Sequence, residues 1–198
     1  MTASTFIFVR HAESEGVHER LAGRTPGIGL TPRGREQAKS TAEYLARFRI
    51  DRIVTSPQQR TRETAVILAE SLHVPVEPHD DFDELDFGVW AGLTFSDLDE
   101  KPEWKTFNSL RSLTAAPGGE SLSDAQTRSI RALLELHSSS KGSCSVVVTH
   151  ADVIRSLVAF LSGTPLDLFL RFIIDPASVS IIHLSDMAVQ IRCLNRTG

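Results

Sequence analysis

Three short runs of apolar and β-branched residues stand out along the chain, and each leads, after a delay in the first case, into a stretch with helical periodicity. The runs are residues 5–9 (TFIFV), 51–56 (DRIVTS) and 144–149 (CSVVVT). Short apolar runs bounded by polar residues are typical of buried strands in sheets that are covered on both faces. We therefore predict three buried strands, each followed by a helix.

Four helices are predicted, each marked by a capping residue at its start or by a glycine at its end. Serine and threonine cap the free N–H groups of a first helical turn, and proline is favoured just inside it. The helices are expected after Thr31-Pro32, after Ser56-Pro57, from Ser121 with Asp124 through Leu133, Leu134 and His137, and over residues 151–162 before Gly163.

The C-terminal part of the chain predicts a hairpin, because residues 178–184 (SVSIIHL) and 188–194 (AVQIRCL) flank the short segment SDM. Strands that alternate with helices favour a mostly parallel sheet with helices on both faces. The predicted fold class is therefore α/β, a three-layer α/β/α sandwich with a mostly parallel central sheet.

Two segments, residues 12–30 and 78–120, do not follow this alternation and are rich in Gly, Pro and charged residues. Long irregular segments in a compact domain are usually functional loops. A chain of 198 residues is most simply one domain. We expect a single domain over residues 1–198, with loop or lid insertions at these two places.

The composition is that of an ordinary globular protein, with 41% hydrophobic and 23% charged residues. The two cysteines, Cys144 and Cys193, lack metal-ligand spacing and are interpreted as free thiols of a reducing compartment. No segment is apolar over the length of a membrane span. We therefore expect a cytoplasmic protein with no membrane partner.

The net charge of −4 conceals a gradient along the chain, with +5 over residues 1–62 and −11 over residues 63–103. Nucleic acid binding needs an extended basic face, which the acidic middle of the chain would interrupt. No nucleic acid partner is expected, whereas a small anion beside the basic N-terminal third is compatible with this distribution.

Arginine and histidine residues follow each of the three predicted strands. Arg10 and His11 come directly after the first strand, Arg60 lies early in the helix after the second, and His150 follows the third. Ligands of parallel sheets bind at the carboxyl ends of strands, where helix N-termini also point. These residues are therefore expected at one edge of the sheet. Arg62 would face another way on its helix and is interpreted as structural.

These residue types suit the chemistry of phosphate esters. Arginine offers a planar donor fork that matches phosphate oxygens. A neutral histidine can attack phosphorus and become a phosphohistidine, and a second, protonated histidine can bind the phosphoryl oxygens. The leaving oxygen needs an acid, for which the segment DDFDELDFGVWAG offers Asp83, Glu84 and Asp86.

The motifs resemble those of the histidine phosphatase superfamily, also called phosphoglycerate mutase-like. VRHAESE is similar to the Arg-His-Gly signature at the end of that family's first strand. Further blocks follow in family order over nearly the whole chain: GLTPRGREQA (29–38), TSPQQRTRETA (55–65), ELDFGVWAGL (84–93), PGGESLSDAQTR (117–128) and VVVTHADVIRSL (146–157).

The resemblance implies a phosphoglycerate mutase-like fold and a phosphatase that hydrolyses a small phosphorylated metabolite. It implies that His11 is the phosphorylated nucleophile and that Glu84 is the general acid/base. It also implies that Arg10, Arg60 and His150 bind the phosphoryl group, and that the reaction needs neither a metal ion nor a cofactor.

The chain departs from the family pattern at two positions. Ala12 replaces the usual glycine, so a methyl group is expected where the backbone approaches phosphate. Val17 stands where many members have a phosphate-contacting asparagine. In the loop LAGRTPGIGL, Arg24 is a candidate substrate contact.

Three alternatives stay open at this point. A mutase would share the chemistry up to the phosphohistidine, but the chain has no match to the paired arginines of the phosphoglycerate mutase insertion. A non-catalytic module that binds phosphorylated ligands is disfavoured because His11 and Glu84 are both present. A metal site formed by His11, His150 and Asp152 is disfavoured by the neighbouring arginines, which repel a cation.

Three aromatic residues of the second irregular segment could either line the substrate side or pack in the core: Trp90, Phe95 and Trp104.

Overall fold

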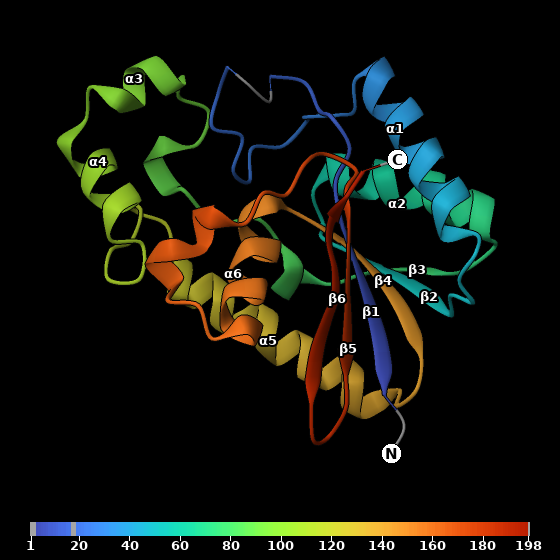
Figure 1. The fold of residues 1–198 in the computed structure, drawn as a ribbon. Coiled ribbons are helices and arrows are strands. Elements are labelled where there is room, and N and C mark those ends of the chain that lie inside the picture. The colour runs from blue at the N-terminus through green and yellow to red at the C-terminus, as the bar shows by residue number, and fades with distance from the viewer. Residues whose placement is uncertain (1–2, 17–18, 198) are drawn as a thin grey trace.

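The computed structural model describes residues 3–16 and 19–197, which form a six-stranded sheet between two layers of helices (Figure 1). The strands are β1 (Ser4–Arg10), β2 (Arg52–Thr55), β3 (Val76–Pro78), β4 (Cys144–Thr149), β5 (Val179–Leu184) and β6 (Val189–Arg196). Their order in the sheet is β3-β2-β4-β1-β5-β6. The first four in this order are parallel, whereas β5 is antiparallel to both of its neighbours.

This arrangement confirms the predicted α/β fold, the three buried strands and the closing hairpin. The sheet is mixed, because the hairpin adds two antiparallel pairings to the four parallel strands. Strand β3 was not predicted, since three residues are too few to show a periodic pattern.

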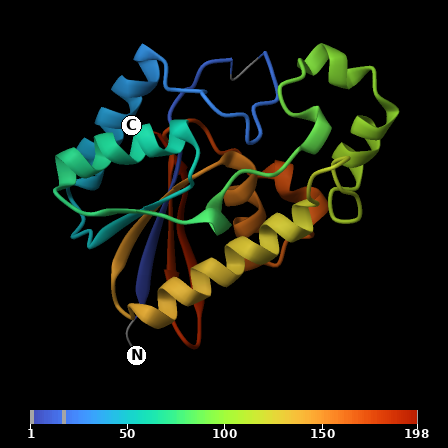
Figure 2. The same ribbon diagram turned by 180° about the vertical axis from the view of Figure 1, so that it is seen from behind.

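The four predicted helices are present as α1 (Pro32–Leu45), α2 (Gln59–Leu72), α5 (Leu122–Ser139) and α6 (Ala151–Ser162). Helices α1 and α2 cover one face of the sheet, and α5 and α6 cover the other (Figures 1 and 2). Thr31 and Ser121 cap α1 and α5 as expected. Helix α2 begins later than predicted, with Gln58 at its N-cap position. The hydroxyl of Ser56 contacts Asp83 and His150.

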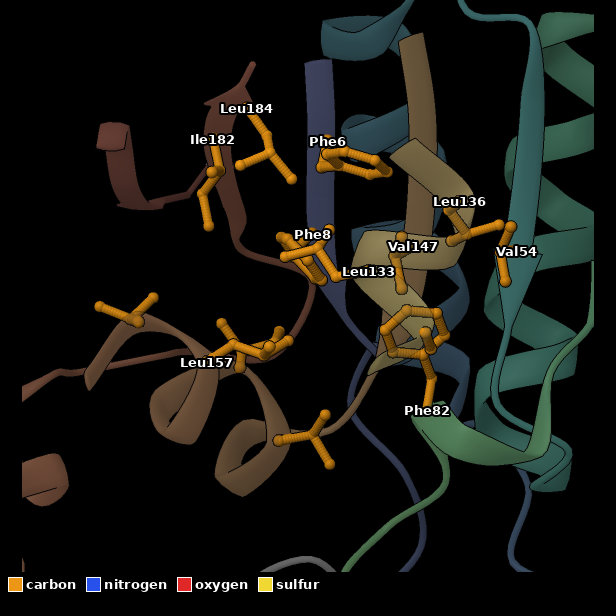
Figure 3. Packing of buried hydrophobic residues seen from close by; sticks show 14 of the residues in the cluster. Phe6, Phe8, Val54, Phe82, Leu133, Leu136, Val147, Leu157, Ile182 and Leu184 are labelled. Atoms are coloured by element: carbon orange, nitrogen blue, oxygen red, sulfur yellow. The ribbon is translucent and has the colours of Figure 1, made fainter. Parts of the chain in front are cut away.

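Strand β1 contributes to the hydrophobic cores on both faces of the sheet, since successive residues of a strand point to opposite faces. Phe6 and Phe8 are fully buried and pack with Leu133 of α5 and Leu157 of α6 (Figure 3). The residues between and after them, Ile7 and Val9, are also fully buried but belong to the core under α1 and α2, with Leu45 and Leu68.

Residues 78–120 are more ordered than the sequence predicted, and their interpretation as irregular was wrong in part. They contain α3 (Phe95–Asp99), α4 (Pro102–Ser109) and two short 3-10 helices, Asp80–Phe82 and Gly88–Trp90. Their aromatic side chains form a separate core in which Trp90, Trp104 and Phe107 pack against one another. Trp90 is a core residue, whereas Trp104 and Phe95 reach the cavity described below.

Two glycines allow this segment to lie against the chain before α5. Gly88 has a positive φ of 51°, and a Cβ built at Gly119 would lie 2.1 Å from the carbonyl oxygen of Asp86. Any larger residue at Gly119 would push its segment away from the segment of Asp86. The close approach lets Glu120 N–H donate to the carbonyl of Asp86 at 2.9 Å, which fixes the segment that carries Glu84.

Across the described ranges, none of the helices combines the length and apolar character that crossing a membrane requires.

Candidate active site

The predicted site residues meet where β1, β2 and β4 end. His11 directly follows β1, Arg60 lies in the first turn of α2, and His150 is the N-cap residue of α6. All three are buried, with at most 5% of each residue exposed. A cavity of about 260 Å³ opens beside them, and Arg10, His11, Arg60 and Glu84 line it. His150 lies behind this lining, with its ring centroid 5.3 Å from that of His11.

The imidazole of His11 is hydrogen-bonded through both nitrogens, and its Nε2 accepts from Arg60 Nε at 3.3 Å. Its Nδ1 lies 2.8 Å from the carbonyl oxygen of Ala12, which requires the proton to be on Nδ1 and leaves the lone pair on Nε2. Burial lowers the pKa of His11 well below its usual value, and the charges of Arg60 and Arg10 lower it further. The lowered pKa favours the neutral form of His11 near pH 7, with a lone pair on Nε2.

Arg10 and Arg60 are each anchored by one backbone carbonyl and keep other donors free. Arg10 Nη1 donates to the carbonyl of Ile174 at 2.7 Å, and Arg60 Nη2 donates to that of Gly23 at 2.7 Å. Within the described part of the chain, the buried Nε of Arg10 and Nη1 of Arg60 have no hydrogen-bond partner. An unpaired buried donor costs about 1–3 kcal/mol, so both arginines favour an anion that supplies acceptors.

His150 is fixed by a hydrogen-bond chain that the sequence did not reveal. Its Nε2 lies 2.8 Å from Ser56 Oγ, and Ser56 Oγ donates to Asp83 Oδ1 at 3.0 Å. The proton of a neutral His150 therefore lies on Nε2, and Nδ1 accepts from Arg60 Nη2 at 3.2 Å. Burial lowers the pKa of His150 well below its usual value, and the charge of Arg60 adds to this effect.

Of the three acidic candidates that the sequence offered, Glu84 is among the residues that line the cavity, which Asp152 also lines. Burial raises the pKa of Glu84 to about 7, and the negative charge of Asp152 adds to this shift. Its Oε2 lies 3.4 Å from His150 Nδ1. Near neutral pH a large share of Glu84 is therefore a neutral acid that can donate a proton.

The other two acidic candidates are not among the residues that line the cavity. Asp83 accepts from Ser56, from the side chain of Gln58 and from the backbone N–H of Glu84. Asp86 is 40% exposed at its side chain and accepts from the N–H of Gly88. The geometry therefore favours Glu84 over both as the proton donor.

Arg24 does not reach the cavity, where the sequence had suggested a substrate contact. Its Nε donates to the backbone carbonyl of Glu84 at 2.9 Å, and its Nη2 donates to Glu120 Oε1 at 2.8 Å. Arg128 Nη2 donates to the same carbonyl of Glu84 at 3.0 Å. Arg24 thus fixes the backbone of Glu84 together with Arg128.

The methyl group of Ala12 does not face the cavity, so the expectation that it meets phosphate is wrong. Ala12 is fully buried in a small cluster with Leu30, Ala38 and Ala177. Its N–H donates to Thr64 Oγ1 at 3.1 Å. Val17, the other departure from the family pattern, lies outside the described residues.

The sequence reasoning missed three further charged residues that line the cavity, Arg20, Arg111 and Arg155. It considered Asp152 only as a metal ligand, whereas the carboxylate accepts from Arg111 Nη1 at 2.8 Å and from Arg155 Nη1 at 3.0 Å. Arg155 lies on α6, within the block VVVTHADVIRSL, and Arg20 lies in the loop that follows β1. Arg111 comes to the cavity because the segment that follows α4 contacts Asp152 of α6.

A comparison with known families decides the affiliation of the chain. The sequence pattern of the histidine phosphatase superfamily (branch 1) matches residues 6–197. The chain belongs to this superfamily. The resemblance stated from the sequence motifs is thereby confirmed, and the mixed α/β sheet with helices on both faces agrees with the fold of its structural neighbours.

Two curated relatives and one solved structure illustrate the similarity of this histidine phosphatase to known proteins. Phosphoserine phosphatase 1 of Hydrogenobacter thermophilus is 35% identical over 96% of this chain and 92% of its own length. Bifunctional protein Rv2228c of Mycobacterium tuberculosis is 33% identical, but the chain spans only 55% of that protein. The structure of mycobacterial glucosyl-3-phosphoglycerate phosphatase Rv2419c has a TM-score of 0.89 and 26% identity, covering 98% of this chain and 100% of its own.

Membership of this superfamily and the relatives named as phosphatases support the predicted hydrolysis of phosphomonoesters.

Proposed function

We propose that this histidine phosphatase hydrolyses small phosphomonoesters through a phosphohistidine at Nε2 of His11. One observation carries the proposal. A neutral imidazole and a carboxyl group with a pKa of about 7 line the same cavity, between arginines that have free donors. Nucleophile, acid and anion-binding groups are therefore present together in the protonation states that the reaction needs.

In the first step, the lone pair of His11 Nε2 forms a bond to phosphorus and the bond from phosphorus to the ester oxygen breaks. Glu84 gives its proton to the departing oxygen, which leaves as an alcohol. In the second step, Glu84 as a carboxylate takes a proton from water while the water oxygen bonds to phosphorus. The N–P bond then breaks, releasing inorganic phosphate and restoring neutral His11.

Arg10, Arg60 and His150 stabilise the charge on the phosphoryl oxygens in both steps. The two arginines supply fixed donors at no further cost in reorganisation. His150 is neutral in the free site, but a bound phosphoryl dianion favours its protonated form, because an opposite charge nearby stabilises a cation. Protonated at Nδ1, His150 would join the donors that hold the phosphoryl group.

The names of the relatives support a small metabolite as substrate, since they include a phosphoserine phosphatase and a glucosyl-3-phosphoglycerate phosphatase. A cytoplasmic location is part of the same proposal. It is supported by two free cysteines, of which Cys144 has its pKa raised to about 11 by burial and by the charge of Asp51. Such a thiol is unreactive and suits a reducing compartment.

The direct test is phosphate release from 4-nitrophenyl phosphate by the purified protein in the presence of EDTA. We expect turnover that the chelator does not reduce, because every group in the proposed steps is a protein side chain. Incubation with 3-phosphoglycerate provides the comparison with a mutase. Formation of 2-phosphoglycerate without net release of phosphate would replace hydrolysis by intramolecular transfer.

The pH dependence of kcat/KM should show the titration of Glu84. With an alkyl ester such as 3-phosphoglycerate the first step needs the protonated acid, so kcat/KM is expected to fall as the pH rises through about 7, the raised pKa of Glu84. The loss at acidic pH should lie well below pH 6.5, because the pKa of His11 is lowered and the ring stays neutral. Substrate ionisation affects all variants equally. If Glu84 is the acid, kcat/KM of the wild type divided by that of Glu84→Gln should fall as the pH rises. A ratio that stays constant with pH would show that Glu84 is not the acid.

A further inference from the structure

Besides Arg10 and Arg60, the cavity is lined by Arg20, Arg111 and Arg155, which the transfer of one phosphoryl group does not require. Arg20 is exposed and its Nη1 donates to the carbonyl of Gly92 at 3.2 Å. Arg111 and Arg155 are instead held by protein contacts on the inner side of the cavity. Their presence raises the question of which part of a substrate they meet.

Arg111 is a rigid, buried cation with a donor to spare. The residue is 6% exposed, and its guanidinium lies over the rings of Phe107 and Phe169, at 4.7 and 5.1 Å from their centroids. Nη1 donates to Asp152 and Nη2 donates to Asn108 Oδ1 at 2.6 Å. Its Nε is buried and has no partner among the described residues. A fixed donor without an acceptor beside a cavity is suited to an anionic ligand group.

Asp152 sets the charge of this part of the cavity. It accepts one hydrogen bond from Arg111 and one from Arg155. Burial alone would favour the neutral acid, but the two arginines lower the pKa of Asp152 below its usual value. The carboxylate is therefore ionised, and the three residues together carry a net charge of one positive unit. That charge matches a monoanion better than a dianion.

The remaining wall of the cavity is largely apolar. It is formed by the side chains of Leu21, Phe87, Phe95, Trp104 and Leu170. Such a wall accommodates the carbon skeleton of a small alcohol between two polar ends. The phosphoryl group would lie at His11, and a second polar group of the substrate would meet Arg111 and Arg155.

We propose that Arg111 and Arg155 bind a carboxylate on the alcohol part of the substrate, and that Asp152 makes this second anion site prefer a carboxylate to a second phosphate. The inference rests on the proposed function, since it identifies the leaving group of the ester that His11 attacks. The substrates are then phosphomonoesters of small hydroxy acids. Arg111 and Asp152 are residues that determine specificity, and they take no part in the bond-making steps.

Binding to the His11→Ala variant tests the site without turnover. Titration calorimetry would compare 3-phosphoglycerate with glycerol 3-phosphate, which lacks the carboxylate, and with propane-1,3-diol bisphosphate, which carries a second phosphate. We expect 3-phosphoglycerate to bind about ten- to a hundredfold more tightly than glycerol 3-phosphate, as one charge-assisted hydrogen-bonded pair provides.

Added to His11→Ala, the substitution Arg111→Gln should remove this preference, and Arg111→Lys should retain part of it because a charge remains without the fork. Asp152→Asn should shift the preference toward the bisphosphate by a similar factor. Lys105→Gln, an exposed lysine on α4, is the matched control and should leave both ratios unchanged. The melting temperature of each variant shows whether it is folded. The comparison of 3-phosphoglycerate with glycerol 3-phosphate uses the His11→Ala variant alone and needs no second substitution.

Equal affinity for 3-phosphoglycerate and glycerol 3-phosphate in His11→Ala would overturn the inference, as would a preference that survives Arg111→Gln. Turnover of 4-nitrophenyl phosphate by the wild type together with equal affinities would remove the carboxylate site and leave the phosphatase. A preference for 3-phosphoglycerate without any turnover would support the site and remove the proposed function.

Discussion

Replacing His11 with glutamine is expected to reduce kcat for 4-nitrophenyl phosphate by at least about a thousandfold, because the amide cannot form the covalent intermediate. What remains would be direct attack by water on a phosphoryl group that Arg10, Arg60 and His150 still bind. The measurement is phosphate release under saturating substrate. A second measurement stops the reaction without acid, because phosphohistidine is acid-labile. It should detect a phosphoenzyme in the wild type and none in His11→Gln.

Glutamine suits this test because its amide can keep a hydrogen bond to the carbonyl of Ala12, which His11 Nδ1 now makes at 2.8 Å. His183→Gln, on β5 away from the cavity, is the matched control and should retain wild-type turnover. If His11→Gln kept more than a tenth of the activity, or if the wild type formed no phosphoenzyme, a nucleophile at His11 would be ruled out.

The second large effect is expected for Glu84→Gln and depends on the leaving group. General acid catalysis contributes about 10²–10⁴-fold, and an alcohol such as that of 3-phosphoglycerate needs the whole of it. The 4-nitrophenolate ion leaves without a proton, so formation of the phosphohistidine from 4-nitrophenyl phosphate should be much less affected. Hydrolysis of the phosphohistidine should still be slow, because Glu84 also activates the water.

Rapid mixing of Glu84→Gln with 4-nitrophenyl phosphate should therefore show a burst of nitrophenol followed by slow turnover. Asp86→Asn is the matched control, since this carboxyl group lies on the same segment and is 40% exposed at its side chain. Equal losses on the alkyl and aryl esters, without a burst, would show that Glu84 acts on binding or folding and not as the acid.

Much of the fold was predictable because its elements are encoded by short-range patterns. The apolar runs of β1, β2 and β4 and the capped periodicity of α1 and α5 depend on residues close together in the chain. The meeting of His11, Arg60 and His150 could also be predicted, because parallel strands end at the same edge of a sheet. Strand β3 was missed because three residues show no periodic pattern. Helices α3 and α4 were missed because such short elements are stabilised by the aromatic core they join.

The position of Arg24 shows which contacts motif reasoning does not reveal. Its place in a glycine-containing loop near the site suggested a ligand contact, but in the structure the guanidinium pairs with Glu120, which is 96 residues away in the sequence. The same holds for Ala12, whose methyl group was expected at phosphate and packs instead with Leu30 and Ala38. In both cases the direction of the side chain is set by contacts between distant segments.

The sequence by itself predicted the three longer parallel strands, the four main helices and the closing hairpin, together with the family. It also predicted that Arg10, His11, Arg60 and His150 meet at one edge of the sheet. Only the tertiary structure decided that burial lowers the pKa of His11 and raises that of Glu84 to about 7. It also decided that Arg111 donates to Asp152, 41 residues further along the chain, and lines the cavity. The reason is physical. Strand and helix patterns arise from neighbouring residues, whereas burial and the charges that shift a pKa depend on distances that the packed chain alone defines.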